Sequence, residues 1–251
     1  MKVRMIVATH KEYRMPADAL YLPVQAGRAL HEALPYQGDD SGENISLKNA
    51  NYCELTCLYW AWKNLDADVV GLRHYRRYFA GKRKSRDPWE RILTEAEASA
   101  LLEKAPLVLP KKRNYWIETG YSQYIHAHHE EDLTVTRAIL EEAYPDYVAA
   151  FDFTLKRTLG HRFNMFLMKR ELLDSYCSWL FDVLGRLEER LDITGYSDYD
   201  KRVFGFVAER LLDVWVETNR IPYTECTVLH MESQHWLKKG TAFLKRKFIG
   251  K

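Results

Sequence analysis

The segment Gly71-Leu72-Arg73-His74-Tyr75-Arg76-Arg77-Tyr78-Phe79 has the highest density of side chains suited to ligand binding. Arginine binds phosphate oxygens through paired N–H donors, and tyrosine rings stack on bases and sugars. We therefore expect the guanidinium groups of this segment to face a cleft and bind a pyrophosphate. The alternative interpretation is a solvated edge whose arginines form ion pairs with nearby carboxylates.

Two further groups of polar residues suit the same chemistry. Thr9, His10 and Lys11 follow an apolar strand predicted over residues 3–8. Open α/β sheets bind ligands at the carboxyl ends of their strands. On the last predicted helix, Arg202 and Glu209 are seven residues apart and share a face. They form either a structural ion-pair ladder or a catalytic carboxylate with a phosphate-binding arginine.

Three acidic pairs and one histidine cluster are candidates for metal binding, because Mg²⁺ and Mn²⁺ prefer oxygen ligands. The pair in residues 66–68 precedes a strand and is interpreted as a turn, and the pair in residues 198–200 is placed to stabilise a helix N-terminus. Asp39 and Asp40 lie in a polar loop and are the best placed, although such pairs are also common in turns. The histidines of residues 126–132 lack a zinc spacing, and we expect one or two of them to bind a sugar hydroxyl or a phosphate.

Composition excludes several classes of protein. The 251 residues are 47% hydrophobic and 29% charged, which excludes a disordered or fibrous chain. Lys plus Arg number 37 against 35 Asp plus Glu, so any basic site must be a local patch. No run approaches the roughly 18 to 20 apolar residues of a membrane span. The motifs GxSxG, GxGxxG and the P-loop are absent, and we expect a soluble cytoplasmic protein without hydrolase, dinucleotide-binding or P-loop chemistry.

These residues need a scaffold of alternating strands and helices. Apolar runs predict strands over residues 3–8, 69–72, 107–109 and 163–168, and helical spacing predicts a helix that Ser46 caps and that runs through Asn64. Thr94 and Glu97 form a capping box. Further helices are predicted near 133–143, 146–158, 172–187 and 203–215. The pattern predicts one mixed α/β domain over residues 1–235, with a helix-rich second half and a basic, apolar tail over 236–251.

Several longer segments carry a resemblance to a known family. They are Asp39–Ser46 with Lys48 and Asn49, Tyr52–Thr56, Tyr59–Asn64, Gly71–Phe79, Phe163–Phe166 and Arg202–Trp215. Together they resemble an uncharacterised-domain family of bacterial capsular and exopolysaccharide glycosyltransferases. The likeness extends from about residue 1 to about residue 232.

The resemblance implies a GT-A-like, Rossmann-like fold and sugar transfer from a nucleotide sugar. For the nucleotide and its diphosphate it implies the residues Thr9, His10, Lys11, Asn44, Lys48, Asn49, Tyr52, His74, Tyr75, Arg76, Arg77 and Arg202. His128, Asp132 and Asn164 are expected near the donor sugar or the acceptor. Because a clear Asp-x-Asp motif is missing, cationic side chains are expected to neutralise the diphosphate. A Mg or Mn cofactor stays an open alternative.

The first hypothesis is therefore a hexosyltransferase acting in capsular, exopolysaccharide or lipopolysaccharide synthesis. It would move a sugar, with galactofuranose as one candidate, from a UDP donor to a glycan or lipid-linked acceptor. An inverting displacement needs a carboxylate that takes the acceptor proton; we prefer Glu209, with Asp132 as the rival.

Two alternatives concern partners. The tail over residues 236–251 suits the inner face of an anionic membrane, or is simply a frayed end. A second function would be a non-catalytic module that binds RNA or anionic glycans through the Arg and Tyr residues of the 71–79 segment. The near-neutral charge weighs against nucleic acid as a partner.

Overall fold

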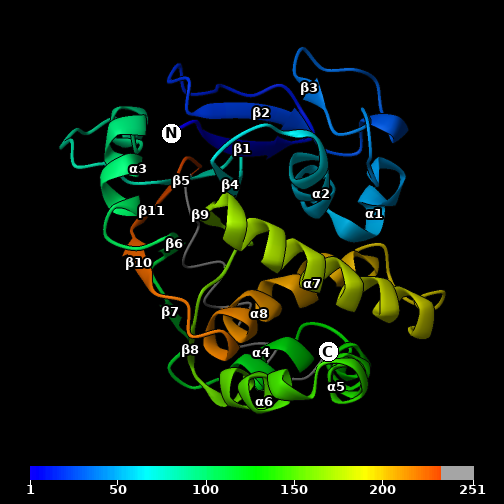
Figure 1. Ribbon diagram of the computed structural model, residues 1–251. Coiled ribbons are helices and arrows are strands. Elements are labelled where there is room, and N and C mark those ends of the chain that lie inside the picture. The colour runs from blue at the N-terminus through cyan, green and yellow to red at the C-terminus, as the bar shows by residue number, and fades with distance from the viewer. Residues whose placement is uncertain (233–251) are drawn as a thin grey trace.

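A mixed sheet runs through the middle of the protein, which is described here by a computed structural model over residues 1–232 (Figure 1). The order of its seven strands is β10-β6-β9-β4-β1-β2-β3. Their bounds are β1 Val3–Thr9, β2 Tyr21–Gln25, β3 Gln37–Gly38, β4 Val69–His74, β6 Leu107–Pro110, β9 Phe166–Lys169 and β10 Tyr223–Cys226. Strand β9 is antiparallel to β4 and β6, whereas the other neighbouring pairs are parallel. The prediction of a mixed α/β domain is confirmed.

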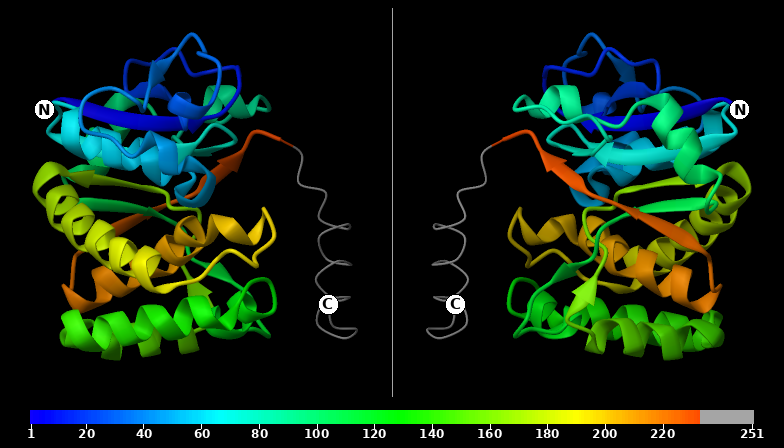
Figure 2. Two further views of the ribbon diagram at one scale, coloured as in Figure 1. Left: turned by 90° about the vertical axis from the view of Figure 1, so that its right-hand side faces the viewer. Right: turned by 90° about the vertical axis from the view of Figure 1, so that its left-hand side faces the viewer.

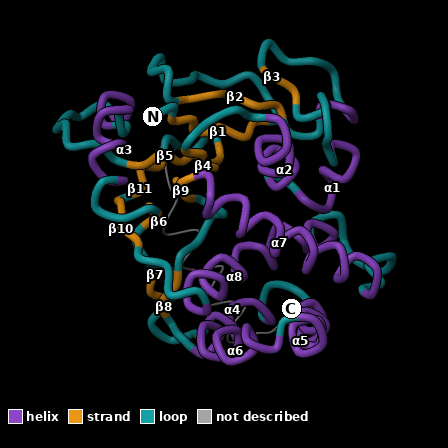
Figure 3. Tube along the Cα trace, viewed as in Figure 1, coloured by secondary structure: helices purple, strands orange, loops and turns teal. Residues whose placement is uncertain are grey.

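Two short antiparallel pairs and a set of helices complete the architecture (Figure 3). The pairs join β5 (Arg77–Phe79) to β11 (Val228–His230) and β7 (Arg113–Asn114) to β8 (Leu159–Gly160). The α-helices are α1 Asn49–Tyr52, α2 Leu55–Asn64, α3 Glu95–Leu102, α4 Gly120–Ile125, α5 Glu130–Ala143, α6 Val148–Lys156, α7 Arg170–Arg190 and α8 Val203–Thr218. Short 3-10 helices cover Arg28–Leu30, Ser46–Lys48, Pro88–Arg91, Pro145–Tyr147 and Asp200–Arg202. None of the helices in residues 1–232 is long and apolar enough to cross a membrane.

Each face of the sheet is buried under its own apolar cluster. Successive strand residues point to opposite faces, so Ile6 and Leu72 join a cluster with residues of α2, α7 and α8. Met5 and Val7 join a second cluster with residues of α3, β5 and β11. Figure 1 shows α4, α5 and α6 as a further layer beyond α7 and α8. The carboxyl ends of β1 and β4, two parallel inner strands, lie side by side at one end of the sheet.

The local predictions fail where the backbone turns unexpectedly. The helix predicted from Ser46 to Asn64 is broken at Cys53, whose φ of 52° ends α1 before α2 begins. Ser46 does not cap it; its hydroxyl accepts from the Ala29 N–H and donates to Asp39. The strand predicted over 163–168 starts only at Phe166.

Other local predictions are confirmed, and the predictions for the C-terminal tail fall outside the described residues. The capping box at α3 is present, because Thr94 Oγ1 accepts from the Glu97 N–H and Glu97 Oε2 accepts from the Thr94 N–H. Strands β1 and β6 match the predictions closely, and β4 extends two residues further, to His74. The predicted tail over 236–251 and the domain boundary at 235 lie outside the described residues.

Candidate active site

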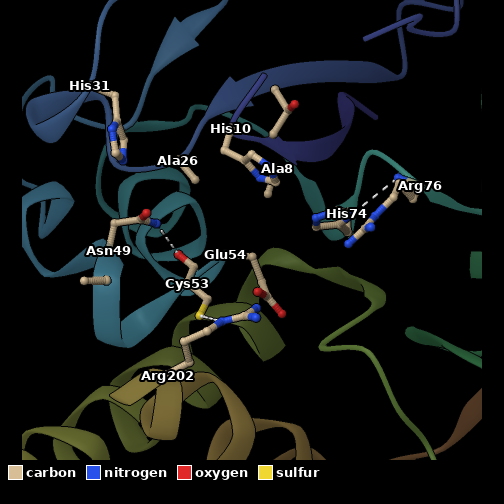
Figure 4. A pocket seen from close by; sticks show the side chains of 12 residues that line it. Ala8, His10, Ala26, His31, Asn49, Cys53, Glu54, His74, Arg76 and Arg202 are labelled. Atoms are coloured by element: carbon tan, nitrogen blue, oxygen red, sulfur yellow. Dashed lines mark hydrogen bonds between the residues drawn. The ribbon is translucent and has the colours of Figure 1, made fainter. Parts of the chain in front are cut away.

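A cleft of about 400 Å³ lies at the carboxyl ends of β1 and β4 (Figure 4). The chain passes from β1 to β2 and β3 on one side, then places β4 on the other side of β1. Such a switch point is where open α/β sheets bind ligands, since the loops diverge there. The lining residues come from five segments and are Ala8, Thr9, His10, Ala26, His31, Asn49, Ala50, Cys53, Glu54, His74, Arg76 and Arg202.

Two imidazoles from the two strand ends line one wall of the cleft. The His10 and His74 ring centres are 6.2 Å apart. The Arg76 N–H lies 3.4 Å from His74 Nδ1, so this nitrogen accepts and the ring carries its proton on Nε2. Burial, followed by the charges of Arg76 and Arg77, lowers the pKa of His74 to about 3. Burial and Arg76 also lower the pKa of His10. His74 is therefore a neutral hydrogen-bond donor near pH 7 and adds no positive charge to the cleft.

Two guanidinium groups supply the positive charge of the cleft. Arg76 follows β4, and its Nη1 lies 3.5 Å from Glu232 Oε2 in a half-exposed ion pair. Such pairs contribute little and exchange readily for a ligand. Arg202 comes from the start of α8, and its Nε donates to Cys53 Sγ at 3.1 Å. Burial raises the pKa of the Cys53 thiol to about 11, so that sulfur stays protonated. Neither guanidinium is committed to a buried carboxylate, and both can bind an anion.

Glu54 supplies the carboxylate in the lining of the cleft. It follows the strained Cys53, and its Oε1 accepts from Asn164 Nδ2 at 2.9 Å. The same amide nitrogen donates to the Gly205 carbonyl at 3.0 Å, which fixes its orientation. Sequence reasoning assigned Glu54 no role, although the residue lies within the Tyr52–Thr56 segment that carries the family resemblance. Figure 4 shows its carboxylate beside the Arg202 guanidinium.

A backbone turn between β8 and β9, hydrogen-bonded to α8, holds Asn164 in place. Phe163 and Asn164 both lie in the left-handed region, with φ values of 84° and 47°. The Phe163 N–H donates to Glu209 Oε2 at 2.7 Å, and the other carboxylate oxygen pairs with Arg210. Burial opposes ionisation of Glu209, but Arg210 and Arg162 hold its pKa below the usual value. Glu209 is thus an ionised anchor for the turn and is not among the residues that line the cleft.

Two guanidiniums of the 71–79 segment, those of Arg73 and Arg77, are not among the groups that line the cleft. The prediction that Arg73 faces the cleft is wrong, because strand alternation sends its side chain to the opposite face of the sheet from His74. Arg73 is fully buried, with its guanidinium carbon 4.4 Å and 4.3 Å from the ring centres of Tyr21 and Tyr78. Tyr75 and Tyr78 are buried as well. The segment therefore offers no exposed Arg and Tyr stacking surface of the kind that an RNA-binding module needs.

The structure brings Thr9, His10, Asn49, His74, Arg76 and Arg202 together in the cleft, as expected. Lys11 and Arg77 fall outside its lining: Lys11 Nζ is 5.3 Å from the Tyr75 ring centre, and the Arg77 guanidinium carbon is 4.3 Å from that of Phe163. Lys48 Nζ and the Tyr52 hydroxyl both contact Glu188 Oε2 on α7, at 2.6 Å and 3.0 Å. Asn44 donates to the carbonyls of Asp40 and Gly42 within its own loop.

Asp132 and His128 also lie outside the cleft lining. Both Asp132 oxygens accept hydrogen bonds of 2.8 Å, from the Tyr124 and Tyr196 hydroxyls. The His128 ring stacks on Phe206, with 4.1 Å between ring centres, and its Nδ1 lies 3.4 Å from Asp200. Asp200 was expected only to stabilise the start of a helix, and in the structure it also contacts His128.

The acidic pairs are placed for structure. Asp39 is buried and accepts from the Gly27 and Arg28 N–H groups and the Ser46 hydroxyl. Asp40 is exposed and does not line the cleft. Within residues 1–232 no three His, Cys, Asp or Glu side chains are grouped for a metal ion. The donor set of the cleft, rich in N–H groups and with one carboxylate, fits an anion better than Mg or Mn.

The fold and the cleft define a glycosyltransferase-like α/β protein, and comparison with known proteins supports this class. The apo structure of WbbM, a bifunctional glycosyltransferase, matches with a TM-score of 0.85 and 29% sequence identity. The match covers 93% of this chain and 46% of WbbM, so the chain spans about half the length of that protein. The fold is GT-A-like. No curated protein matches the chain.

Residues 4–220 match the family described as a domain of unknown function, DUF4422. The chain belongs to this family.

Proposed function

We propose that the protein is a glycosyltransferase that takes a hexose from a UDP-sugar and transfers it to a hydroxyl of a glycan or lipid-linked acceptor. The single observation that supports this most is the cleft at the switch point of the sheet, where Arg76 and Arg202 face Glu54. The likeness to WbbM adds that the same fold occurs in a bifunctional glycosyltransferase. Galactofuranose as the sugar, and capsular, exopolysaccharide or lipopolysaccharide synthesis as the pathway, stay proposals that rest on the resemblance.

The cationic wall of the cleft would stabilise the leaving group. When the bond between the anomeric carbon and the diphosphate breaks, negative charge develops on the diphosphate oxygens. Arg76 and Arg202 would pair with this charge, and His74 would donate from Nε2 without adding charge of its own. Preorganised donors of this kind lower the barrier because they need not reorient during the reaction.

The carboxylate of the cleft would activate the acceptor. We propose Glu54 as the general base: the acceptor oxygen attacks the anomeric carbon, its proton passes to the Glu54 carboxylate, and the sugar inverts. Asn164 donates to Glu54 Oε1 and leaves Oε2 for the acceptor. This replaces the expected role of Glu209, which would act as a positioning residue through Phe163 and Asn164.

Isothermal titration with UDP tests the proposal. Loss of a charged hydrogen bond costs about 1.5–3 kcal/mol, so Arg76→Ala is expected to weaken UDP binding roughly tenfold to a hundredfold. The matched control is Arg83→Ala, which removes an exposed arginine paired only with Glu90 among the described residues. Parallel titrations with Mn²⁺, Mg²⁺ and a chelator decide the metal question.

Sugar transfer is then measured with radiolabelled UDP-galactofuranose and UDP-galactose. Failure of the folded protein to bind UDP or either sugar nucleotide would refute the proposal. Equal UDP affinity for the Arg76→Ala and Arg83→Ala variants would refute the role of Arg76.

A further inference from the structure

A second surface of the protein combines exposed apolar side chains with basic ones. Eight large apolar side chains are exposed within residues 1–232, and four of them come from two short segments, residues 116–117 and 153–159. These four are Trp116, Ile117, Phe153 and Leu159, and we call them the hairpin patch. Trp116 is 81% exposed and Phe153 51%. Exposed clusters of this kind mark interaction surfaces.

Backbone hydrogen bonds hold the two segments side by side. The Tyr115 N–H donates to the Thr158 carbonyl at 3.0 Å, and the Gly120 N–H donates to the Arg157 carbonyl at 2.8 Å. Strands β7 and β8 pair directly, with Asn114 opposite Leu159. The loop that carries Trp116 therefore lies against the chain that carries Leu159, a few residues beyond Phe153.

Trp116 is presented outward by a strained turn. Its φ of 59° is an outlier for a large side chain, since glycine or asparagine normally occupies this region. The Trp116 N–H donates to Asn114 Oδ1 at 2.8 Å, and the Ile117 N–H donates to the Tyr115 carbonyl at 2.6 Å. These two hydrogen bonds hold the turn in its strained conformation. Holding an indole in solvent at a cost in strain indicates a binding role.

Basic side chains predominate in the two segments that carry the hairpin patch. Residues 111–117 and 153–159 contain five basic side chains and no Asp or Glu; the basic residues are Lys111, Lys112, Arg113, Lys156 and Arg157. Lys111 and Lys156 are exposed. The Arg157 guanidinium carbon lies 5.0 Å from the Phe153 ring centre and its Nη1 3.3 Å from Glu217. An apolar centre with an aromatic ring and a basic surround is complementary to an anionic lipid surface.

We propose that the hairpin patch docks the protein on an anionic phospholipid bilayer. Trp116 and Phe153 would enter the interface between headgroups and acyl chains, where aromatic rings are favoured, while the lysines meet the phosphates. In both views of Figure 2, the green helical layer, to which α6 belongs, lies on the far side of the yellow and orange helices from the blue strands. This inference goes beyond the proposed function and does not depend on it.

Vesicle co-sedimentation of the full 251-residue chain tests the docking. The probes are vesicles of phosphatidylcholine alone and of phosphatidylcholine with phosphatidylglycerol at three to one. We expect binding to the anionic vesicles that weakens in high salt, and a fall of at least about tenfold in the partition constant for Trp116→Ala/Phe153→Ala. The matched control is Leu30→Ala/Leu47→Ala, which removes two exposed apolar side chains elsewhere and should bind like the parent.

A charge variant keeps the test decisive if the apolar variant does not fold. Lys111→Glu/Lys156→Glu changes only exposed side chains and should weaken binding by about fivefold or more for each lysine. Parent-level vesicle binding by both folded variants would overturn the proposal, because another part of the chain would then hold the lipid. Absence of vesicle binding by the parent would overturn it too. Self-association lost in the variants, without lipid binding, would assign the patch to a protein contact instead.

Discussion

Replacing Glu54 by glutamine isolates proton transfer from every other property of the cleft. The introduced side chain would still offer an amide oxygen to Asn164, whose present hydrogen bond to Glu54 Oε1 is 2.9 Å long, so it should stay in position. The Glu54→Gln variant cannot take a proton. A general base contributes about 10²–10⁴-fold to the rate of the catalysed step. The substitution also removes a negative charge from an anion site, so UDP should bind as tightly as before or more tightly. We therefore expect kcat to fall by about 10²–10⁴ while the Kd for UDP does not rise.

The assay is initial-rate transfer from saturating radiolabelled donor, with UDP affinity from titration. Glu43→Gln is a matched control, because Glu43 is an exposed carboxylate that contacts Tyr59 and Lys63 and does not line the cleft. Glu209→Gln tests the rival base: it should lower thermal stability through the loss of charge beside Arg210, with a smaller effect on kcat. A kcat for Glu54→Gln within about tenfold of the parent would refute the role of Glu54. A larger loss for a stably folded Glu209→Gln would restore the original assignment.

Two further outcomes concern buried basic groups. The folded-state pKa of His74, about 3, lies below the ordinary value of 6.5, so between these values the unfolded chain binds the extra proton and stability falls with falling pH. Urea unfolding of the parent and of His74→Gln should show the parent losing at most about 2 kcal/mol relative to the variant between about pH 7.5 and 5; a constant difference would contradict the burial. The three guanidinium nitrogens of Arg73 have no hydrogen-bond partner within residues 1–232, so Arg73→Met should leave the free energy of unfolding unchanged or higher, with unchanged UDP affinity. Weaker UDP binding by that variant would reinstate Arg73 in the cleft.

The alternation of side chains along β4 separates what could be predicted about residues 71–79 from what could not. Apolar runs located β4, and the rule that ligands bind at carboxyl strand ends placed His74 and Arg76 correctly. The same run could not show that regular strand geometry continues to His74. That continuation makes Arg73 and His74 face opposite sides of the sheet, with Arg73 between two tyrosines.

The sequence alone determined the alternating strands and helices, the absence of several common nucleotide and hydrolase motifs, and the six residues that the cleft gathers from those predicted. Those features follow from local rules of periodicity, capping and chain direction, except Asn49, which only the family resemblance implied. Only the tertiary structure decided that Glu54 belongs to the cleft and Glu209 does not. Glu54 is oriented by Asn164, 110 residues further on, through two positive-φ turns that no local pattern marks. A contact between residues so far apart in the chain forms only when the elements that carry them pack together. Local sequence patterns do not determine that packing.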